Sequence, residues 1–204
     1  MKRSEVRIGM VSWAHIHAQF RARALTEIPG ARIVAVSDDN RPRGERAANE
    51  FGATFVNDWR DLVNRPDIDV VMVHSENSRH PEQVIEAARA GKHVFCEKPV
   101  ATDVQDAEKM VAAIEEAGVD GTAAFVSRFS KEASRASQVM NSGAIGEVLF
   151  TRSFIGLEGL EEIGLPDEMV AWMADPDLGG GGAWIDEGSH AVDLLRWLIG
   201  DIAE

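Results

Sequence analysis

Apolar and polar positions alternate in blocks along the chain as far as Ala123. Short apolar runs recur, and stretches with the apolar spacing of a helix follow them. The expected strands are Val6–Val11, Arg32–Ser37, Thr54–Val56, Asp69–Val73 and His93–Cys96. The expected helices are His15–Thr26, Pro42–Phe51, Asp58–Val63, Pro81–Ala90 and Val104–Ala117. Strands that alternate with helices favour an α/β fold with a parallel sheet covered on both faces.

The pattern changes between Ala123 and Arg128, and we therefore expect two domains, at 1–123 and 124–204. The elements expected in the second are a helix at Lys131–Asn141, a longer strand at Glu147–Ile155, an irregular acidic stretch at Gly156–Asp177 and a helix from about Asp186 to Ile199. A run of glycines precedes the last helix.

Charge and cysteine content exclude several classes of function. The net charge is −13, from 34 acidic and 21 basic residues, which disfavours binding to nucleic acid or to anionic membranes. No apolar run approaches the roughly 20 residues that a membrane span needs. The single cysteine, Cys96, falls in an expected buried strand and fits a reducing compartment, so we predict a cytoplasmic protein. The apolar run Ile8–Ala14 is too short for a signal peptide.

The first strand, the turn after it and the next helix predict a dinucleotide-binding, doubly wound Rossmann sheet. The glycine positions of the turn are filled by Ser12, Ala14 and His17, of which the first two are small enough for close approach of a phosphate. The turn residues expected to bind the cofactor are Ser12, Trp13, Ala14, His15 and Ile16.

An acid ends the second strand, where a carboxylate accepts hydrogen bonds from the ribose hydroxyls of adenosine. This acid is Asp38, and it disfavours a 2′-phosphate, so NAD is expected rather than NADP. Arg41 and Arg43 follow closely and soften that preference. The alternative is that Asp38 and Asp39 cap the next helix.

Two short runs carry catalytic chemistry. Lys98 follows the last expected strand, and Asp186 and His190 are four residues apart on one helix. A lysine, a histidine and an orienting aspartate suit the transfer of a proton to and from a hydroxyl group. The alternatives are a surface lysine and a solvated helix face. Pro99 opposes the first because it fixes the corner after the strand.

These runs resemble the motifs of a known family. Residues 91–99, GKHVFCEKP, are similar to the G-K-H-V-x-x-E-K-P motif of the Gfo/Idh/MocA oxidoreductases, which include glucose–fructose oxidoreductase and inositol dehydrogenase. Residues 180–193 resemble that family's G-G-G…D-x-G-x-H-x-x-D motif, and residues 128–129 and 143–147 match further landmarks.

The resemblance implies an NAD(P)-dependent dehydrogenase that transfers a hydride between the nicotinamide and a sugar, polyol or related cyclic alcohol. Lys98 would hydrogen-bond the reacting hydroxyl, His190 would be the general acid and base, and Asp186 would orient His190. Glu97 would approach the nicotinamide ribose. The further residues implied to bind the cofactor or face the cleft are Ser75, Asn77, His80, Lys98 and Arg128.

Family members continue with further strands that build an open α+β substrate and dimerisation domain. We therefore expect 124–204 to be an incomplete part of that domain, and the full-length protein to be a homo-oligomer. Two other functions stay open: a hydrolase or epimerase that oxidises its substrate transiently, and a non-catalytic nucleotide-binding subunit. No metal is expected, since no cysteine or carboxylate accompanies His15 and His17 in the sequence. Trp172 and Trp184 either wall a sugar site or belong to the core.

Overall fold

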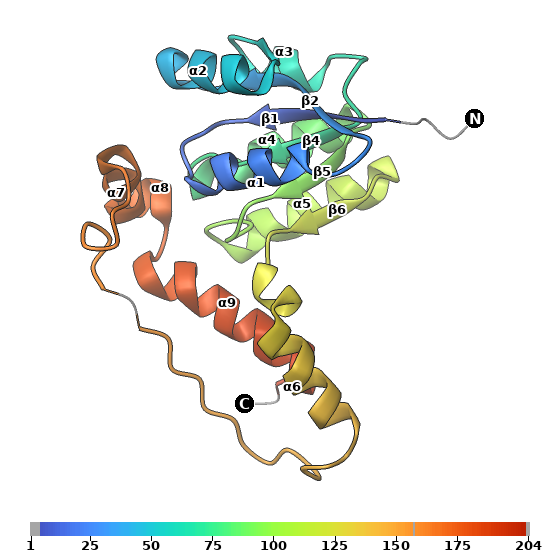
Figure 1. The fold of residues 1–204 in the computed structure, drawn as a ribbon, viewed down its shortest axis with the longest axis vertical. Helices are drawn as coiled ribbons and strands as arrows, with labels where there is room; N and C mark the ends of the chain where they lie inside the picture. Colours follow the sequence, from blue (N-terminus) through green and yellow to red (C-terminus); the bar gives the residue numbers. More distant parts are fainter. Residues whose placement is uncertain (1–4, 157, 203–204) are drawn as a thin grey trace.

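A six-stranded parallel sheet forms the upper part of the molecule (Figure 1). The computed structural model describes residues 5–156 and 158–202. The strands are β1 (Val6–Val11), β2 (Ala31–Ser37), β3 (Thr54–Phe55), β4 (Val70–Val73), β5 (His93–Cys96) and β6 (Gly121–Ala123). Their order is β3-β2-β1-β4-β5-β6, so the direction of winding reverses between β1 and β4. The expected α/β, doubly wound Rossmann sheet is confirmed, and its ligand crevice lies at the carboxyl ends of these strands.

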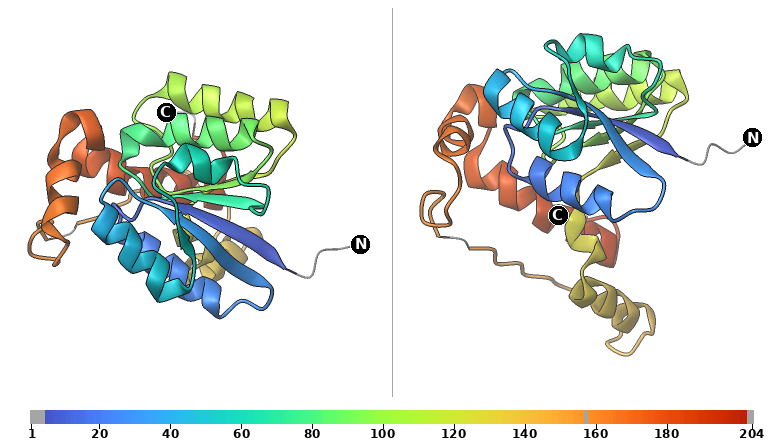
Figure 2. Two further views of the ribbon diagram at one scale, coloured as in Figure 1. Left: turned by 90° about the horizontal axis from the view of Figure 1, so that it is seen from above. Right: turned by 45° about the horizontal axis from the view of Figure 1, so that its top comes forward.

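Helices cover both faces of the sheet, as the left view of Figure 2 shows. The two layers are α1 (His17–Thr26) with α2 (Arg41–Phe51), and α3 (Trp59–Val63) with α4 (His80–Arg89) and α5 (Val104–Ala117). Neighbouring residues of one strand feed opposite layers: Met10 packs with Ala18 of α1, whereas Val11 packs with Leu62 of α3. Alternate residues of a strand point to opposite faces of the sheet, and helices cover both faces. Every position of the strand is therefore apolar, and the strands appear in the sequence as continuous apolar runs.

Local signals place the helix ends. Asn40 accepts a hydrogen bond from Arg43 N at 3.2 Å and caps α2, and Asp103 caps α5 in the same way. Gly52 and Gly118 end these helices with φ near 64°. The first helix starts at His17, two residues later than expected, because residues 15 and 16 belong to the turn after β1.

The remaining elements form a helical lower part (Figure 1). They are η2 (Val126–Phe129), α6 (Lys131–Asn141), α7 (Asp167–Ala174), α8 (Pro176–Gly179) and α9 (Gly182–Ile199), whereas the short helix η1 (Asn77–Arg79) lies between β4 and α4 in the sheet unit. The final helix begins four residues before its expected start at Asp186. Helix α6 packs on α9 and η2, while α7 and α8 lie at the crevice end of the sheet.

Two expectations for this part are wrong. The strand expected at Glu147–Ile155 is an extended segment without strand pairing, visible in Figure 1 as a long trace between α6 and α7. No other strand of the described residues lies beside it to complete its hydrogen bonds, and a lone strand is not stable. The stretch at Gly156–Asp177, expected to be irregular, contains α7 and the start of α8.

Within the described ranges, no helix combines the length and the apolar character that crossing a membrane requires.

Candidate active site

In the turn after β1, Ser12 occupies the first glycine position of the dinucleotide-binding motif and keeps the backbone conformation of a glycine. Ser12 adopts φ of 68°, the one non-glycine residue with positive φ in the part of the chain that the structure describes. Its Oγ accepts a hydrogen bond from Ala14 N at 3.0 Å, and its own N–H donates to Ser37 O at 2.7 Å. These bonds hold a conformation that disfavours side chains.

The amide groups of this turn have acceptors inside the protein. Trp13 N donates to Asp38 Oδ2 at 2.6 Å, His15 N to His74 O at 3.0 Å, and His17 N to the His15 ring at 3.1 Å. Ile16 N contacts Met169 Sδ of α7 at 3.4 Å. A thioether is a weak acceptor, so Ile16 N–H is the amide most easily given to another ligand.

Asp38 lies at the end of β2, as expected, but its carboxylate is buried and fully engaged. Arg43 donates to it through Nε at 3.0 Å and through Nη2 at 2.9 Å, and Asn40 N donates at 2.7 Å. Glu168 of α7 holds the other side of Arg43 at 2.6 Å. The alternative role of Asp38 as helix cap is wrong, because Asn40 caps α2. Before Asp38 can accept from a ribose, Arg43 must move aside.

Lys98, Asp186 and His190 meet at one place. Lys98 follows β5, is buried, and forms an ion pair with Asp186 of α9. His190 lies one turn further along α9. Its ring packs edge-on against Phe125, with 6.2 Å between the two ring centres. Burial first, and then the Lys98 ammonium, lower the pKa of His190 below 6.5. The lowered pKa favours the neutral imidazole, which is able to accept a proton.

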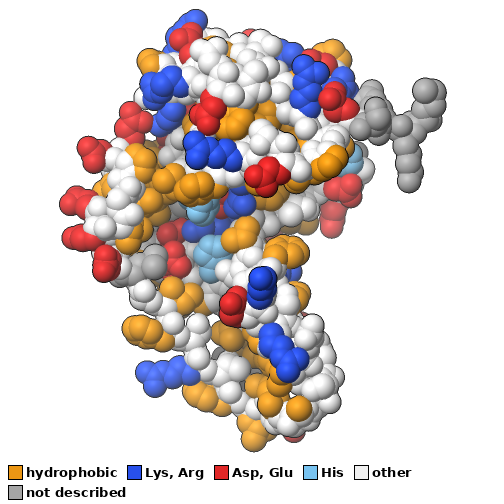
Figure 3. Space-filling model, viewed as in Figure 1, with side chains coloured by type: hydrophobic (Ala, Val, Ile, Leu, Met, Phe, Trp, Pro, Cys, Tyr) orange, Lys and Arg blue, Asp and Glu red, His pale blue; other side chains and the backbone are white. Residues whose placement is uncertain are grey.

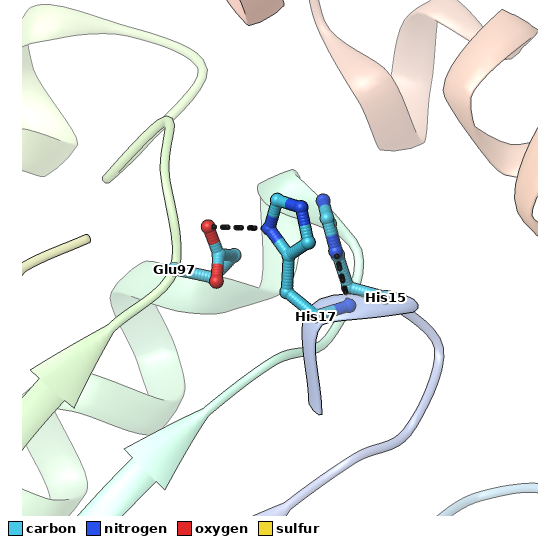
Figure 4. Close-up of side chains that lie close together, drawn as sticks. All are labelled: His15, His17 and Glu97. Carbon is cyan, nitrogen blue, oxygen red and sulfur yellow. Dashed lines mark hydrogen bonds and ion pairs between the residues drawn. The ribbon is translucent and has the colours of Figure 1, made fainter. Parts of the chain in front are cut away.

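Glu97 is fully buried beside this group, and Figure 4 shows its carboxylate next to the rings of His17 and His15. Arg21 binds its Oε2 through Nε at 3.1 Å and Nη2 at 2.9 Å, and His17 Nδ1 lies 3.3 Å from Oε1. Burial alone would raise the pKa of Glu97, but contacts with His17, His15 and Arg21 hold it below its usual range. Sequence reasoning missed Arg21, although its spacing of four from His17 places both on one helix face.

His15, expected near the cofactor, is buried in the turn with its ring centre 4.3 Å from that of His17. Burial lowers its pKa to about 2, so the ring is neutral. His74, to which no role was given, is fully buried, and neither of its ring nitrogens has a hydrogen-bond partner.

Asn77 contributes an unsatisfied atom to the crevice. Its Nδ2 donates to Gly179 O at 2.9 Å, whereas its buried Oδ1 has no partner. Ser75 Oγ donates to Gln83 at 2.6 Å. His80 is wholly buried, and its ring nitrogens lie 2.9 and 3.1 Å from the carbonyl oxygens of Pro99 and Ser75. The structure places His80 beneath the crevice, where it positions the loop after β4.

Arg128 forms an ion pair with Asp193 of α9, with Nε 2.7 Å from Oδ2. It therefore ties η2 to α9, and its guanidinium does not contact Lys98, Asp186 or His190. The two tryptophans differ: Trp172 is buried and donates to Ala14 O at 3.3 Å, whereas Trp184 is 81% exposed. Cys96 is buried, and burial raises the pKa of its thiol, as expected of an inert core residue.

A cleft of about 600 Å³ opens beside the start of α9. Figure 3 shows histidine, basic and acidic side chains gathered where the surface is hollowed between the two parts of the molecule. Gly180, between α8 and α9, has φ of 90°, and a Cβ there would lie 2.7 Å from the Thr102 side chain, so glycine is favoured at this position. The cleft is lined by polar and apolar groups that include Asn77, Phe154, Gly179, Trp184, Asp186 and Glu187.

Comparison with known proteins places this geometry in a family. Residues 6–125 match the oxidoreductase family with an NAD-binding Rossmann fold, and residues 133–204 match the GFO/IDH/MocA C-terminal domain. The 2,7-anhydro-N-acetylneuraminate hydratase of Mediterraneibacter gnavus is 35% identical over 89% of this chain and 46% of its own length. The levoglucosan dehydrogenase of Pseudarthrobacter phenanthrenivorans is 31% identical over 86% of this chain and 44% of its own.

Among solved structures, the WlbA dehydrogenase from Bordetella pertussis, in complex with NADH and UDP-GlcNAcA, superposes with a TM-score of 0.84 at 26% identity. The match covers 98% of this chain and 57% of that one. This chain thus spans about half the length of the curated relatives that it matches. The two family matches together cover nearly all of the described residues, and the chain belongs to the GFO/IDH/MocA family of oxidoreductases, with an NAD-binding Rossmann fold at residues 6–125.

Proposed function

We propose that this chain carries the cofactor domain and the catalytic group of an NAD-dependent dehydrogenase acting on a sugar, polyol or related cyclic alcohol. The observation that carries the proposal is the junction of Lys98, Asp186 and the neutral His190 at the carboxyl ends of β4 and β5, next to a cleft of about 600 Å³. Relatives named as sugar dehydrogenases support the substrate class.

The residues present fit a nicotinamide dinucleotide. Ser12 gives the β1–α1 turn its glycine-like backbone, and the buried Oδ1 of Asn77 and Nδ1 of His190 have no partner within the protein. Buried polar atoms without partners are costly unless a ligand or water satisfies them. The turn residues 12–16, Ser75, Asn77 and Glu97 would hold the cofactor, which supplies a hydride acceptor or donor when it is bound.

The side chains divide the proton chemistry. The Lys98 ammonium favours the alkoxide form of a hydroxyl that it hydrogen-bonds. His190, whose lowered pKa favours the neutral ring, accepts the hydroxyl proton on an imidazole nitrogen and returns it in the reverse direction. Asp186 holds the Lys98 ammonium and lies one turn before His190, so this ion pair joins Lys98 to the helix that carries His190.

We propose NAD rather than NADP because the carboxylate of Asp38 stands at the end of β2. Arg43 opposes this preference, since it already pairs with that carboxylate and would also attract a 2′-phosphate. Binding calorimetry with both cofactors tests the assignment. Tighter binding of NADP, or an unchanged preference in Asp38→Ala, would contradict it.

A second candidate is a lyase or hydratase that oxidises its substrate only transiently. It is favoured by the relative named as a 2,7-anhydro-N-acetylneuraminate hydratase, with 35% identity. Release of NADH during steady-state turnover separates the two, because a transient oxidation restores NAD within each cycle.

The experiment for the catalytic assignment compares Lys98→Met and His190→Asn with Lys109→Met, a change on the exposed side of α5. We expect turnover on a panel of sugars and polyols to fall about 10²–10⁴-fold in the first two, the usual contribution of general acid–base catalysis. NAD affinity should change little in His190→Asn, whereas Lys98→Met also removes a residue implied to contact the cofactor. Equal turnover in all three variants would show that Lys98 and His190 do not take part in catalysis. Binding of NAD without any turnover would favour the nucleotide-binding subunit.

We also propose a cytoplasmic location and, for the full-length protein, a homo-oligomer. The buried, unpaired Cys96 supports the first, and the exposed apolar side chains between Val148 and Ile155 support the second. Light scattering over a range of protein concentrations tests the oligomer, and a monomer at every concentration would rule it out.

A further inference from the structure

Three side chains that are separate in the sequence meet beneath the turn after β1. His15 lies in the turn after β1, His17 is the first residue of α1, and Glu97 follows β5 (Figure 4). Each offers one ligand atom, and the three atoms lie within 4.8 Å of one another. Sequence analysis found no acid near the two histidines, but the fold brings one to them from 80 residues further along the chain.

We propose that His15, His17 and Glu97 form a binding site for Zn²⁺. Two imidazoles and one carboxylate, with a fourth position open, are a known ligand set for this ion. Imidazole ligands favour late divalent transition metals over Mg²⁺ or Ca²⁺, which prefer sites built of oxygen atoms.

Arg21 orients the carboxylate for this role. Its guanidinium occupies Oε2 of Glu97 with contacts of 2.9 and 3.1 Å, which leaves Oε1 directed at His17. Partners of this kind fix the direction of a metal ligand in known sites. The nearby ammonium of Lys98 is paired with Asp186, and Arg21 is paired with Glu97, so each of the two cations has its own carboxylate.

The histidines also have lone pairs to offer. In the neutral His15 ring the one lone pair accepts the His17 N–H at 3.1 Å, a hydrogen bond that metal binding would replace. The ring of His17 adds a second observation. Its Nδ1 is buried and, although it lies 3.3 Å from Glu97 Oε1, it makes no hydrogen bond with a protein partner. A buried nitrogen of the cluster itself is therefore left unsatisfied, and a bound metal ion would satisfy it.

Occupation of the site has a consequence for the cofactor, and this step rests on the proposed function. His15 belongs to the turn expected to bind the pyrophosphate, and Glu97 is expected at the nicotinamide ribose. An ion bridging them would hold both side chains away from a dinucleotide. Zn²⁺ and NAD should therefore compete for the apo chain.

The direct test is calorimetric titration of the chelator-treated chain with Zn²⁺, together with absorption spectra after addition of Co²⁺, whose visible bands report the ligand geometry. The variants are His17→Gln and His15→Gln. The matched control is His93→Gln, which removes an exposed histidine that also pairs with a carboxylate, Asp120, at 3.2 Å. Thermal unfolding of each variant shows whether it is folded.

We expect Zn²⁺ affinity to fall by at least about 10–100-fold in His17→Gln and His15→Gln, since even loss of an outer-shell partner costs that much. His93→Gln should bind as the unchanged chain does. No Zn²⁺ binding by the unchanged chain, or equal affinity in all variants, would overturn the site.

A second titration measures NAD affinity with and without saturating Zn²⁺. Weaker NAD binding in the presence of Zn²⁺, with relief in His17→Gln, supports the competition. An unchanged NAD affinity overturns it. If NAD does not bind even without metal, the proposed function fails, and the first titration still decides the metal site.

Discussion

The sheet unit at residues 5–125 and the helical part at 126–202 differ in how far their apolar side chains are buried. In the first, strand and helix side chains such as Met10, Leu62 and Val71 are fully buried. In the second, Leu149, Phe150 and Phe154 are between 82 and 88% exposed. Similar apolar runs therefore have different outcomes, because only the first have paired strands and covering helices. Burial depends on the partners that the fold supplies as well as on the run itself.

The helical part is joined to the sheet unit largely by polar contacts. Lys98 reaches Asp186, Asn77 reaches Gly179, and Trp172 reaches Ala14, all at the crevice end of the sheet. The candidate active site is thus also the junction between a well-packed unit and a loosely packed one. Each measurement below tests this contrast.

Hydrogen exchange should show the largest difference. Amides of β1 and β4 are expected to open only with global unfolding, at about 5–15 kcal/mol for a typical domain, while those of residues 147–156 should exchange at nearly 0 kcal/mol. Exchange followed by mass spectrometry measures both in one sample. Strong protection at 147–156 would mean that the strand expected there from the sequence does form in solution.

The loss of unfolding free energy on replacing a leucine by alanine should also differ between the two parts of the molecule. Leu62→Ala removes a fully buried side chain and should lower the free energy of unfolding by about 2–5 kcal/mol. Leu149→Ala removes one that is 87% exposed and should change it by less than about 0.5 kcal/mol. Denaturant unfolding provides the comparison. Similar losses in both variants would show that Leu149 is covered in solution.

Substitutions of Ser12 in the turn after β1 should change stability according to whether the new residue tolerates a positive φ. Ser12→Ala keeps a side chain at positive φ and loses the Oγ hydrogen bond, whereas Ser12→Gly loses the bond but relieves the strain. The glycine variant should therefore be the more stable of the two, by about 1 kcal/mol. Thermal unfolding of the pair measures this difference. If the alanine variant is as stable as the glycine variant, Ser12 is not strained.

The smallest effect is a change in titration at the junction. The pKa of His190 lies below 6.5 because of burial and the Lys98 ammonium, so the ring should take up its proton only as pH falls below that value. Lys98→Met removes the positive charge and leaves the Asp186 carboxylate free, and both changes should raise the pKa of His190. NMR titration of the imidazole follows this shift. An unchanged or lower pKa would show that Lys98 does not act on His190.

Much of the fold was predictable because strands and helices of the sheet unit follow local patterns. The motif residues Lys98, Asp186 and His190 were also found by spacing, and the structure brings them together. Contacts made between distant segments were not predictable. The hydrogen bonds of Arg21 to Glu97 and of Asn77 to Gly179 depend on which side chains two elements place side by side. The strand expected at Glu147–Ile155 failed for the same reason, since no pattern within it shows whether a partner is present.

The amides of residues 13–17 all have acceptors within the protein, which makes ligand capture at this turn an exchange of partners. An anion that takes one of these N–H groups displaces an existing bond, so the number of hydrogen bonds hardly changes on binding. Affinity then has to come from charge neutralisation and from released water. Association should also be slower than the diffusion limit, because hydrogen bonds within the turn must break before its amides can bind the ligand.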